Sequence, residues 1–297
     1  MWVRAAAAVI GRAPAGRYRM AHALGRFAGP PFLRRLPPAL GGYTFHCDIR
    51  DTVAREVCFT GRYEPQETQL AARVLRRGMT AVDVGANWGY FTLAAAHWVG
   101  PTGRVIAFEP EPRLFAMASA NVARNALAHV AVRPFAVAAS AGALRLAAFD
   151  DRQGNWGVSQ VSANGAIECP AVALDDHLDS EGVGSVDLLK VDVEGAEIDV
   201  LEGMRQGIAT GRYRYVMLEC HPAALSARGV PVDACATPFL AAGYRAWTIV
   251  HTPDVHRRAA GRALPAGELL QPFEAGGSRS ALWPHCFFAA PAAADPV

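Results

Sequence analysis

Lysine is almost absent from this sequence: Lys190 is the only one, and every other basic residue is arginine. The chain also lacks a large excess of either charge, because 29 basic residues face 27 acidic ones and leave a net charge of +2. This balance gives no broad positive field, so nucleic acid is not an expected partner. No apolar run reaches the roughly 20 residues that span a bilayer, and we expect a cytoplasmic protein.

Paired cysteine motifs are absent as well. The six cysteines include no C-x-x-C pair, and the neighbours Cys220 and His221 do not complete a zinc-binding spacing. The sequence therefore predicts buried free thiols, which are typical of a reducing compartment, and no disulfide framework.

Acidic residues are missing from the first 47 positions, where seven arginines lie between Arg4 and Arg35. Proline and glycine interrupt the same stretch, so we expect residues 1–40 to form a basic, Pro/Gly/Arg-rich extension. A single domain over residues 41–297, with its core at about 79–250, should follow. The extension carries enough positive charge for a weak contact with an anionic membrane surface, although a solvated arm is the simpler interpretation. Nothing in the sequence indicates an oligomeric state.

Beyond residue 41, short apolar strands alternate with apolar-faced helices. This alternation is typical of an α/β protein with a Rossmann-like, mostly parallel sheet and helices on both faces. Residues 138–169 show weak alternation and predict a hairpin or loop around 154–157. Strands are expected at 42–47, 80–84, 103–108, 130–137, 185–193, 215–220, 244–250 and 286–290, and helices at 65–76, 90–99, 113–125, 197–204 and 232–242.

A glycine-containing turn follows the strand at 80–84. Gly85 and Gly89 are spaced G-x-x-x-G, whereas a dinucleotide site needs G-x-G-x-x-G to bring a pyrophosphate to backbone N–H groups. Asp83 at the strand end would repel a diphosphate but suits a cation. S-adenosylmethionine is such a ligand, since it carries an ammonium and a sulfonium and no phosphate. Glu109, at the end of the next strand, can accept hydrogen bonds from both ribose hydroxyls.

Four blocks, at residues 61–68, 82–93, 105–110 and 188–197, resemble the FkbM family of S-adenosylmethionine-dependent methyltransferases. The similarity runs from about residue 41 to residue 244. Its most specific part is the Lys-x-Asp-x-Glu-Gly-x-Glu pattern that begins at Lys190. The resemblance implies a class I methyltransferase fold with a seven-stranded sheet, and methyl transfer to a hydroxyl of a sugar or secondary metabolite. The chain departs from the family at 138–141, Ala-Ala-Ser-Ala, where an Asp commonly follows.

Three groups of candidate site residues follow from these patterns. The catalytic candidates are Asp192, His221 and Lys190, although Lys190 could equally form a structural pair with an acid. Asp192, Glu194, Glu219 and His221 could also converge as metal ligands, but no spacing demands it and no metal is predicted. The cofactor candidates are Asp83, Gly85, Asn87, Gly89, Glu109, Pro110 and Ala136, and the acceptor candidates are Tyr63, Trp156, Glu194 and Glu219.

The favoured function is O-methylation of a small-molecule acceptor in natural-product or glycan biosynthesis. Two alternatives stay open. One is an NAD(P)-dependent oxidoreductase on a similar sheet, which the missing third glycine and Asp83 disfavour. The other is a non-catalytic, cofactor-binding scaffold, suggested by the basic N-terminal stretch.

Overall fold

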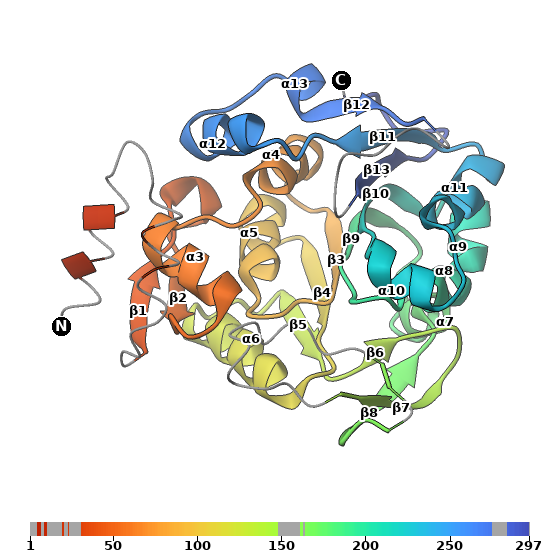
Figure 1. The fold of residues 1–297 in the computed structure, drawn as a ribbon, viewed down its shortest axis with the longest axis horizontal. Helices are drawn as coiled ribbons and strands as arrows, with labels where there is room; N and C mark the ends of the chain where they lie inside the picture. The colour runs from red at the N-terminus through yellow and green to blue at the C-terminus, as the bar shows by residue number, and fades with distance from the viewer. Residues whose placement is uncertain are drawn as a thin grey trace.

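The computed structural model describes residues 31–147, 161–162, 164–274 and 284–296, together with Ala5, Ala6, Val9, Ile10, Met20 and Ala23. Its centre is an eight-stranded sheet (Figure 1). In spatial order the strands are β12 (Leu270–Pro272), β11 (Arg245–Ile249), β13 (His285–Ala289), β10 (Tyr213–Glu219), β9 (Val186–Val191), β3 (Thr80–Val84), β4 (Arg104–Phe108) and β5 (Val130–Arg133).

The sheet is mostly parallel, as the sequence predicts. Strands β10, β9, β3, β4 and β5 run parallel, while β13 is antiparallel to both β10 and β11. The expected α/β fold is therefore confirmed. The expected number of seven strands differs from the eight that are found, because the three-residue strand β12 pairs with the outer edge of β11. So short a segment has no periodicity that a sequence analysis can detect.

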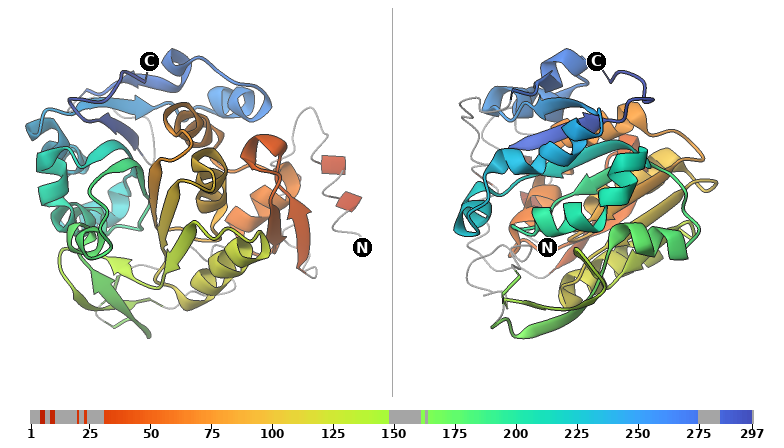
Figure 2. Two further views of the ribbon diagram at one scale, coloured as in Figure 1. Left: turned by 180° about the vertical axis from the view of Figure 1, so that it is seen from behind. Right: turned by 90° about the vertical axis from the view of Figure 1, so that its right-hand side faces the viewer.

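Helices cover both faces of the sheet because the strand order reverses between β3 and β9. The chain moves outward from β3 to β5 and then returns to build β9 and β10 on the other side. Right-handed crossovers place the connecting helices on opposite faces in these two halves (Figure 2). One set contains α4 (Pro65–Val74), α5 (Tyr90–Val99), α6 (Pro112–Arg124) and α12 (Pro253–Gly261), and the other contains α7 (Leu174–Ser180), α8 (Glu197–Gly203), α9 (Arg205–Thr210) and α11 (Thr237–Ala241).

A second, three-stranded sheet replaces part of the expected loop. The strand predicted at 130–137 divides into β5 and β6 (Ala136–Val137), and β6 pairs with β8 (Ile167–Val172). Strand β7 (Gly142–Leu146) pairs antiparallel with β8. Residues 138–169 thus contain regular strands whose small side chains hide the alternation. The loop expected around 154–157 lies outside the described residues.

The packed body begins before residue 41. Strand β1 (Phe32–Arg35) pairs antiparallel with β2 (Thr44–Cys47), and Leu36 and Leu40 between them are buried. Helix α3 (Thr52–Thr60), which the sequence analysis missed, follows and begins at the capping residue Asp51. The expected boundary at residue 40 therefore falls inside a folded region, and only residues before about 31 remain candidates for an extension.

Two further expectations bear on the environment of the chain. All six cysteines are buried and free. Among the described residues, no helix has the length and apolar character needed to cross a bilayer.

Candidate active site

A cavity of about 470 Å³ opens at the carboxyl ends of the parallel strands, next to the point where their order reverses. In open α/β sheets this is where ligands bind, and the volume lies in the range of small-molecule sites. Most of the predicted site residues meet there. Those that line it are Tyr63, Gly85, Asn87, Glu109, Pro110, Ala136, Asp192, Glu194, Glu219 and His221.

Of the other four predicted residues, the three that the structure describes do not line this cavity. Asp83 and Lys190 line a small adjoining pocket beneath the turn. Gly89 is the N-cap residue of α5, at the point where the turn ends and the helix begins. Trp156 lies outside the described residues.

The glycine turn is fixed by close approach of two backbone segments. Gly85, Asn87 and Gly89 all have positive φ angles, of 85°, 53° and 78°. The N–H groups of Gly85 and Ala86 both donate to the carbonyl of Phe108 at the end of β4, at 3.0 and 2.9 Å. A Cβ atom at Gly85 would lie only 1.9 Å from the carbonyl oxygen of Asp192. Glycine at position 85 therefore lets the turn lie against the end of β9.

Glu109 is buried at the wall of the cavity, directly beside the turn. Its Oε2 accepts the N–H of Asn87 at 2.7 Å, and its Oε1 accepts the N–H of Glu111 at 3.0 Å. Burial raises the pKa of Glu109 to about 7, although these two N–H groups act in the opposite direction. Each carboxylate oxygen keeps a further lone pair, so the group can also accept hydrogen bonds from a ligand.

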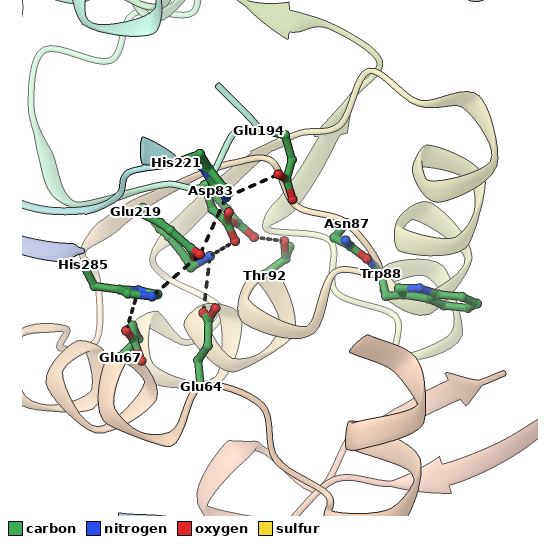
Figure 3. A network of polar contacts seen from close by, with 12 residues as sticks. Glu64, Glu67, Asp83, Asn87, Trp88, Thr92, Glu194, Glu219, His221 and His285 are labelled. Atoms are coloured by element: carbon green, nitrogen blue, oxygen red, sulfur yellow. Dashed lines mark hydrogen bonds and ion pairs between the residues drawn. The ribbon is translucent and has the colours of Figure 1, made fainter. Parts of the chain in front are cut away.

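Asp83 has a different role from the one its position in sequence suggests. The side chain is buried, and its Oδ2 accepts the hydroxyl of Thr92 at 2.5 Å (Figure 3). Burial raises the pKa of Asp83, and the charge of Lys190 partly counters this effect. The carboxylate thus fastens α5 and faces Lys190 from beneath the turn, rather than forming a wall of the main cavity.

Lys190 lies in a buried cluster of opposite charges. Its Nζ is 2.7 Å from Asp192 Oδ2 and 3.5 Å from Glu64 Oε2. Burial would lower the pKa of Lys190, but the carboxylates of Asp192 and Glu64 outweigh it and hold that pKa well above its ordinary value. Burial opposes ionisation of Asp192 too, yet Lys190 keeps the Asp192 pKa low. The pair with an acid that the sequence offered as an alternative is the arrangement found.

His221 is held in one orientation by a buried acid. Glu197 Oε1 accepts the backbone N–H of His221 at 2.9 Å and lies 2.7 Å from Nδ1 of its ring. The ring Nε2 then faces Glu194 Oε2 at 3.4 Å and Glu219 Oε1 at 3.7 Å. Burial disfavours the charged ring, but Glu197, Glu194 and Glu219 together raise the pKa of His221 to about 9. The pKa of His221 therefore lies above the ordinary value near 6.5 that makes a histidine a candidate base.

One polar group near the site escaped the sequence analysis. Glu67 in α4 contacts Nε2 of His251. Glu67 also lies 2.9 Å from Nδ1 of His285, and Nε2 of His285 is 3.7 Å from Glu219 (Figure 3). The two imidazole rings stack with centroids 3.7 Å apart and planes 15° apart. Because Glu67 and His251 are 184 positions apart, only the fold brings them together.

Comparison with known proteins identifies the core of the chain. The family model described as "Methyltransferase FkbM domain" matches residues 83–246. Methyltransferase sdnD of Sordaria araneosa is 32% identical over 154 residues, covering 41% of this chain and 59% of the relative. The 31-O-demethyl-FK506 methyltransferase FkbM of Streptomyces tacrolimicus is 32% identical over 177 residues, covering 50% and 67%. The chain thus spans about three fifths to two thirds of the length of these relatives.

More distant similarities are found as well. Hexuronic acid methyltransferase AglP of Haloferax volcanii is 27% identical over 139 residues, covering 47% of this chain and 54% of the relative. Among solved structures, the methyltransferase FkbM from Methylobacillus flagellatus KT is similar with a TM-score of 0.45 and 15% identity, covering 91% of this chain and 57% of that one.

Proposed function

The chain belongs to the FkbM family of methyltransferases, and on this premise we propose that it transfers a methyl group from S-adenosylmethionine to a hydroxyl of a small molecule. One observation carries the proposal. A single cavity joins a buried acid beside the glycine turn, Glu109, to a group of carboxylates around Asp192. The first suits the nucleoside of a cationic cofactor, and the second suits an acceptor that gives up a proton.

The residues around the turn fit this cofactor. Glu109 keeps the acceptor capacity for ribose hydroxyls, and Pro110 and Ala136 supply an apolar wall for the adenine ring. Gly85 lines the cavity and has no side chain to occupy it. S-adenosylmethionine supplies an electrophilic methyl group on a sulfonium, and the surrounding negative charge favours such a cation over a diphosphate.

At the acceptor end, we assign Asp192 the role of receiving the hydroxyl proton. Lys190 keeps its carboxylate ionised, and a hydroxyl must lie roughly 3 Å from the methyl carbon for in-line displacement. Lys190 therefore acts as a positioning residue. Tyr63, Glu194 and Glu219 form the remaining walls, and His221 holds its proton among the acids.

Two kinds of support favour a small-molecule acceptor. The cavity is of small-molecule size, and the names of the relatives refer to methylation of FK506 and of a hexuronic acid. Family membership also favours methyl transfer over the oxidoreductase and scaffold alternatives. The acidic acceptor end agrees with this choice, since neither alternative needs one.

Titration calorimetry tests the cofactor directly. We expect S-adenosylmethionine and S-adenosylhomocysteine to saturate one site, and Glu109→Gln to bind both at least about tenfold more weakly, the loss of one charge-assisted hydrogen bond. Glu202→Gln is the matched control, because Glu202 is exposed and forms an ion pair with exposed Arg205. Saturable binding of NAD with no binding of S-adenosylmethionine would overturn the proposal.

Methyl-labelled cofactor tests the transfer itself. A labelled small-molecule product whose methyl group survives mild alkali is a methyl ether and supports transfer to a hydroxyl. A product that loses its label in alkali is an ester, and would show that the acceptor is a carboxylate.

A further inference from the structure

Three side chains at the acceptor end point polar atoms at one small volume. One ligand atom each from Asp192, Glu219 and His221 lies within 4.8 Å of the others. Glu194 Oε2 approaches the same imidazole nitrogen at 3.4 Å. In a coordination shell with bonds of about 2.1 Å, neighbouring ligand atoms lie about 3.0 Å apart and opposite ones about 4.2 Å apart. The distances from His221 Nε2 to Glu194 and to Glu219, 3.4 and 3.7 Å, lie between these two values.

The orientation of His221 is a second, separate observation. Its side chain is only 7% exposed, and Nδ1 is engaged by Glu197, which is fully buried on α8. Nε2 is thereby aimed into the cavity at carboxylate oxygens. Metal-binding histidines are held in this way, with a carboxylate on one ring nitrogen and the ion on the other.

Carboxylates outnumber the side-chain cations around this volume: the ring of His221 contacts Glu194 and Glu219, and an ion bound at Nε2 would take the place of its proton. Asp192, Glu194 and Glu219 face this volume, and Lys190 is already shared between Asp192 and Glu64. Carboxylates brought this close repel one another, which favours a positive charge between them.

From this geometry we propose that the acceptor end binds a divalent cation through Asp192, Glu219 and His221, with Glu194 beside it. One imidazole and two carboxylates form a mixed nitrogen and oxygen set that suits Mn²⁺ or Zn²⁺ better than Mg²⁺. The inference rests on the proposed function for its purpose: a cation at this point binds the acceptor hydroxyl and makes its proton easier to lose.

The neighbouring group of Glu67, His251 and His285 has a similar composition but the wrong geometry for an ion. Metal bonds lie in the plane of an imidazole ring, and these two rings are stacked 3.7 Å apart and nearly parallel. A single ion cannot lie in both planes at bonding distance. Glu67 Oε1 also contacts both rings already. This group therefore serves as the matched control.

Titration of the whole chain with Mn²⁺, followed by electron paramagnetic resonance, tests the site without a known acceptor. We expect one bound ion with a ¹⁴N coupling from imidazole, about tenfold or more weaker in Asp192→Asn and in Glu219→Gln. Glu67→Gln should bind Mn²⁺ like the wild type. Zn²⁺ competition should release the bound Mn²⁺.

The outcomes separate this inference from the proposed function. Thermal unfolding of each variant shows whether it folds, and calorimetry with S-adenosylhomocysteine on the same samples shows whether the cofactor site is intact. Saturable binding that depends on Asp192 and Glu219 supports the cation site. If a chain that binds S-adenosylhomocysteine takes up neither Mn²⁺ nor Zn²⁺, or if Glu67→Gln removes binding and Glu219→Gln does not, the inference is wrong while the methyltransferase proposal stands.

Discussion

Gly85 and Asp192 meet backbone to backbone: a Cβ atom on the glycine would lie 1.9 Å from the carbonyl oxygen of the aspartate. This contact joins the turn after β3 to the end of β9, so it sets the position of the proposed cofactor end relative to the proposed acceptor end. Asp192 N–H completes the link by donating to the carbonyl of Val84 at 2.9 Å. The geometry of the cavity therefore depends on a position where no side chain fits.

Gly85→Ala should be strongly destabilising. The φ angle of 85° already disfavours an L-residue, and the methyl group would collide with a backbone atom that cannot rotate away. We expect a loss of about 3 kcal/mol or more in the free energy of unfolding, measured in urea. Gly182→Ala is the control, because φ is 67° there and nothing lies within 4 Å of the added carbon. It should cost about 1 kcal/mol. Equal losses in the two variants would show that the contact with Asp192 is unimportant.

Cofactor affinity should rise with pH through neutrality. Burial raises the pKa of Glu109 to about 7, and its ionised form accepts ribose hydroxyl hydrogens better than the protonated form does. The affinity for S-adenosylhomocysteine should therefore increase from about pH 6 to about pH 8, as the ionised fraction of Glu109 grows. Calorimetry at several pH values measures this, and Glu109→Gln should lose the dependence. A slope that persists in Glu109→Gln belongs to another group.

Lys190→Met should unfold at a lower denaturant concentration than the wild type. Removing the ammonium leaves the carboxylates of Asp192 and Glu64 buried without their partner, which costs about 3 to 5 kcal/mol. Glu64→Gln in the same chain should restore part of this stability, and the double-mutant cycle measures the coupling. Arg205→Met, at an exposed ion pair, should change stability by well under 1 kcal/mol. A loss that small for Lys190→Met would mean that water reaches these charges.

Most of the residues that the sequence predicts for the cofactor end line one cavity together, and their signals are local. The strand at 80–84, the turn through Gly85 and the acid at Glu109 lie close together in the chain, and each has a distinct physical requirement. Asp83 shows the limit of the same reasoning. The sequence shows the charge of Asp83 but not the direction in which its side chain faces, because that depends on packing. In the structure the carboxylate accepts a hydrogen bond from Thr92 on α5.

The acceptor end was only partly predictable. The motif from Lys190 to Glu197 identified most of the charged residues, but it could not show which of them pair. Glu197, the last residue of this motif, lies behind His221 and fixes its ring. His285 and Glu67 gave no signal at all, because they come from opposite ends of the chain and meet only through the pairing of β13 with β10. Similarly, the weak alternation of residues 138–169 predicts a hairpin or loop but does not give the bounds of β7 and β8.

The place of β13 has a consequence for how the molecule is made. Residues 285–289 fill the gap between β10 and β11, two strands that leave the ribosome earlier. Until that segment is synthesised, both strands have unpaired backbone groups along the sides that will later face each other. Translation must therefore proceed almost forty residues past β11 before this half of the sheet can close, which makes it the late-folding part of the molecule and the one that a chaperone would shield.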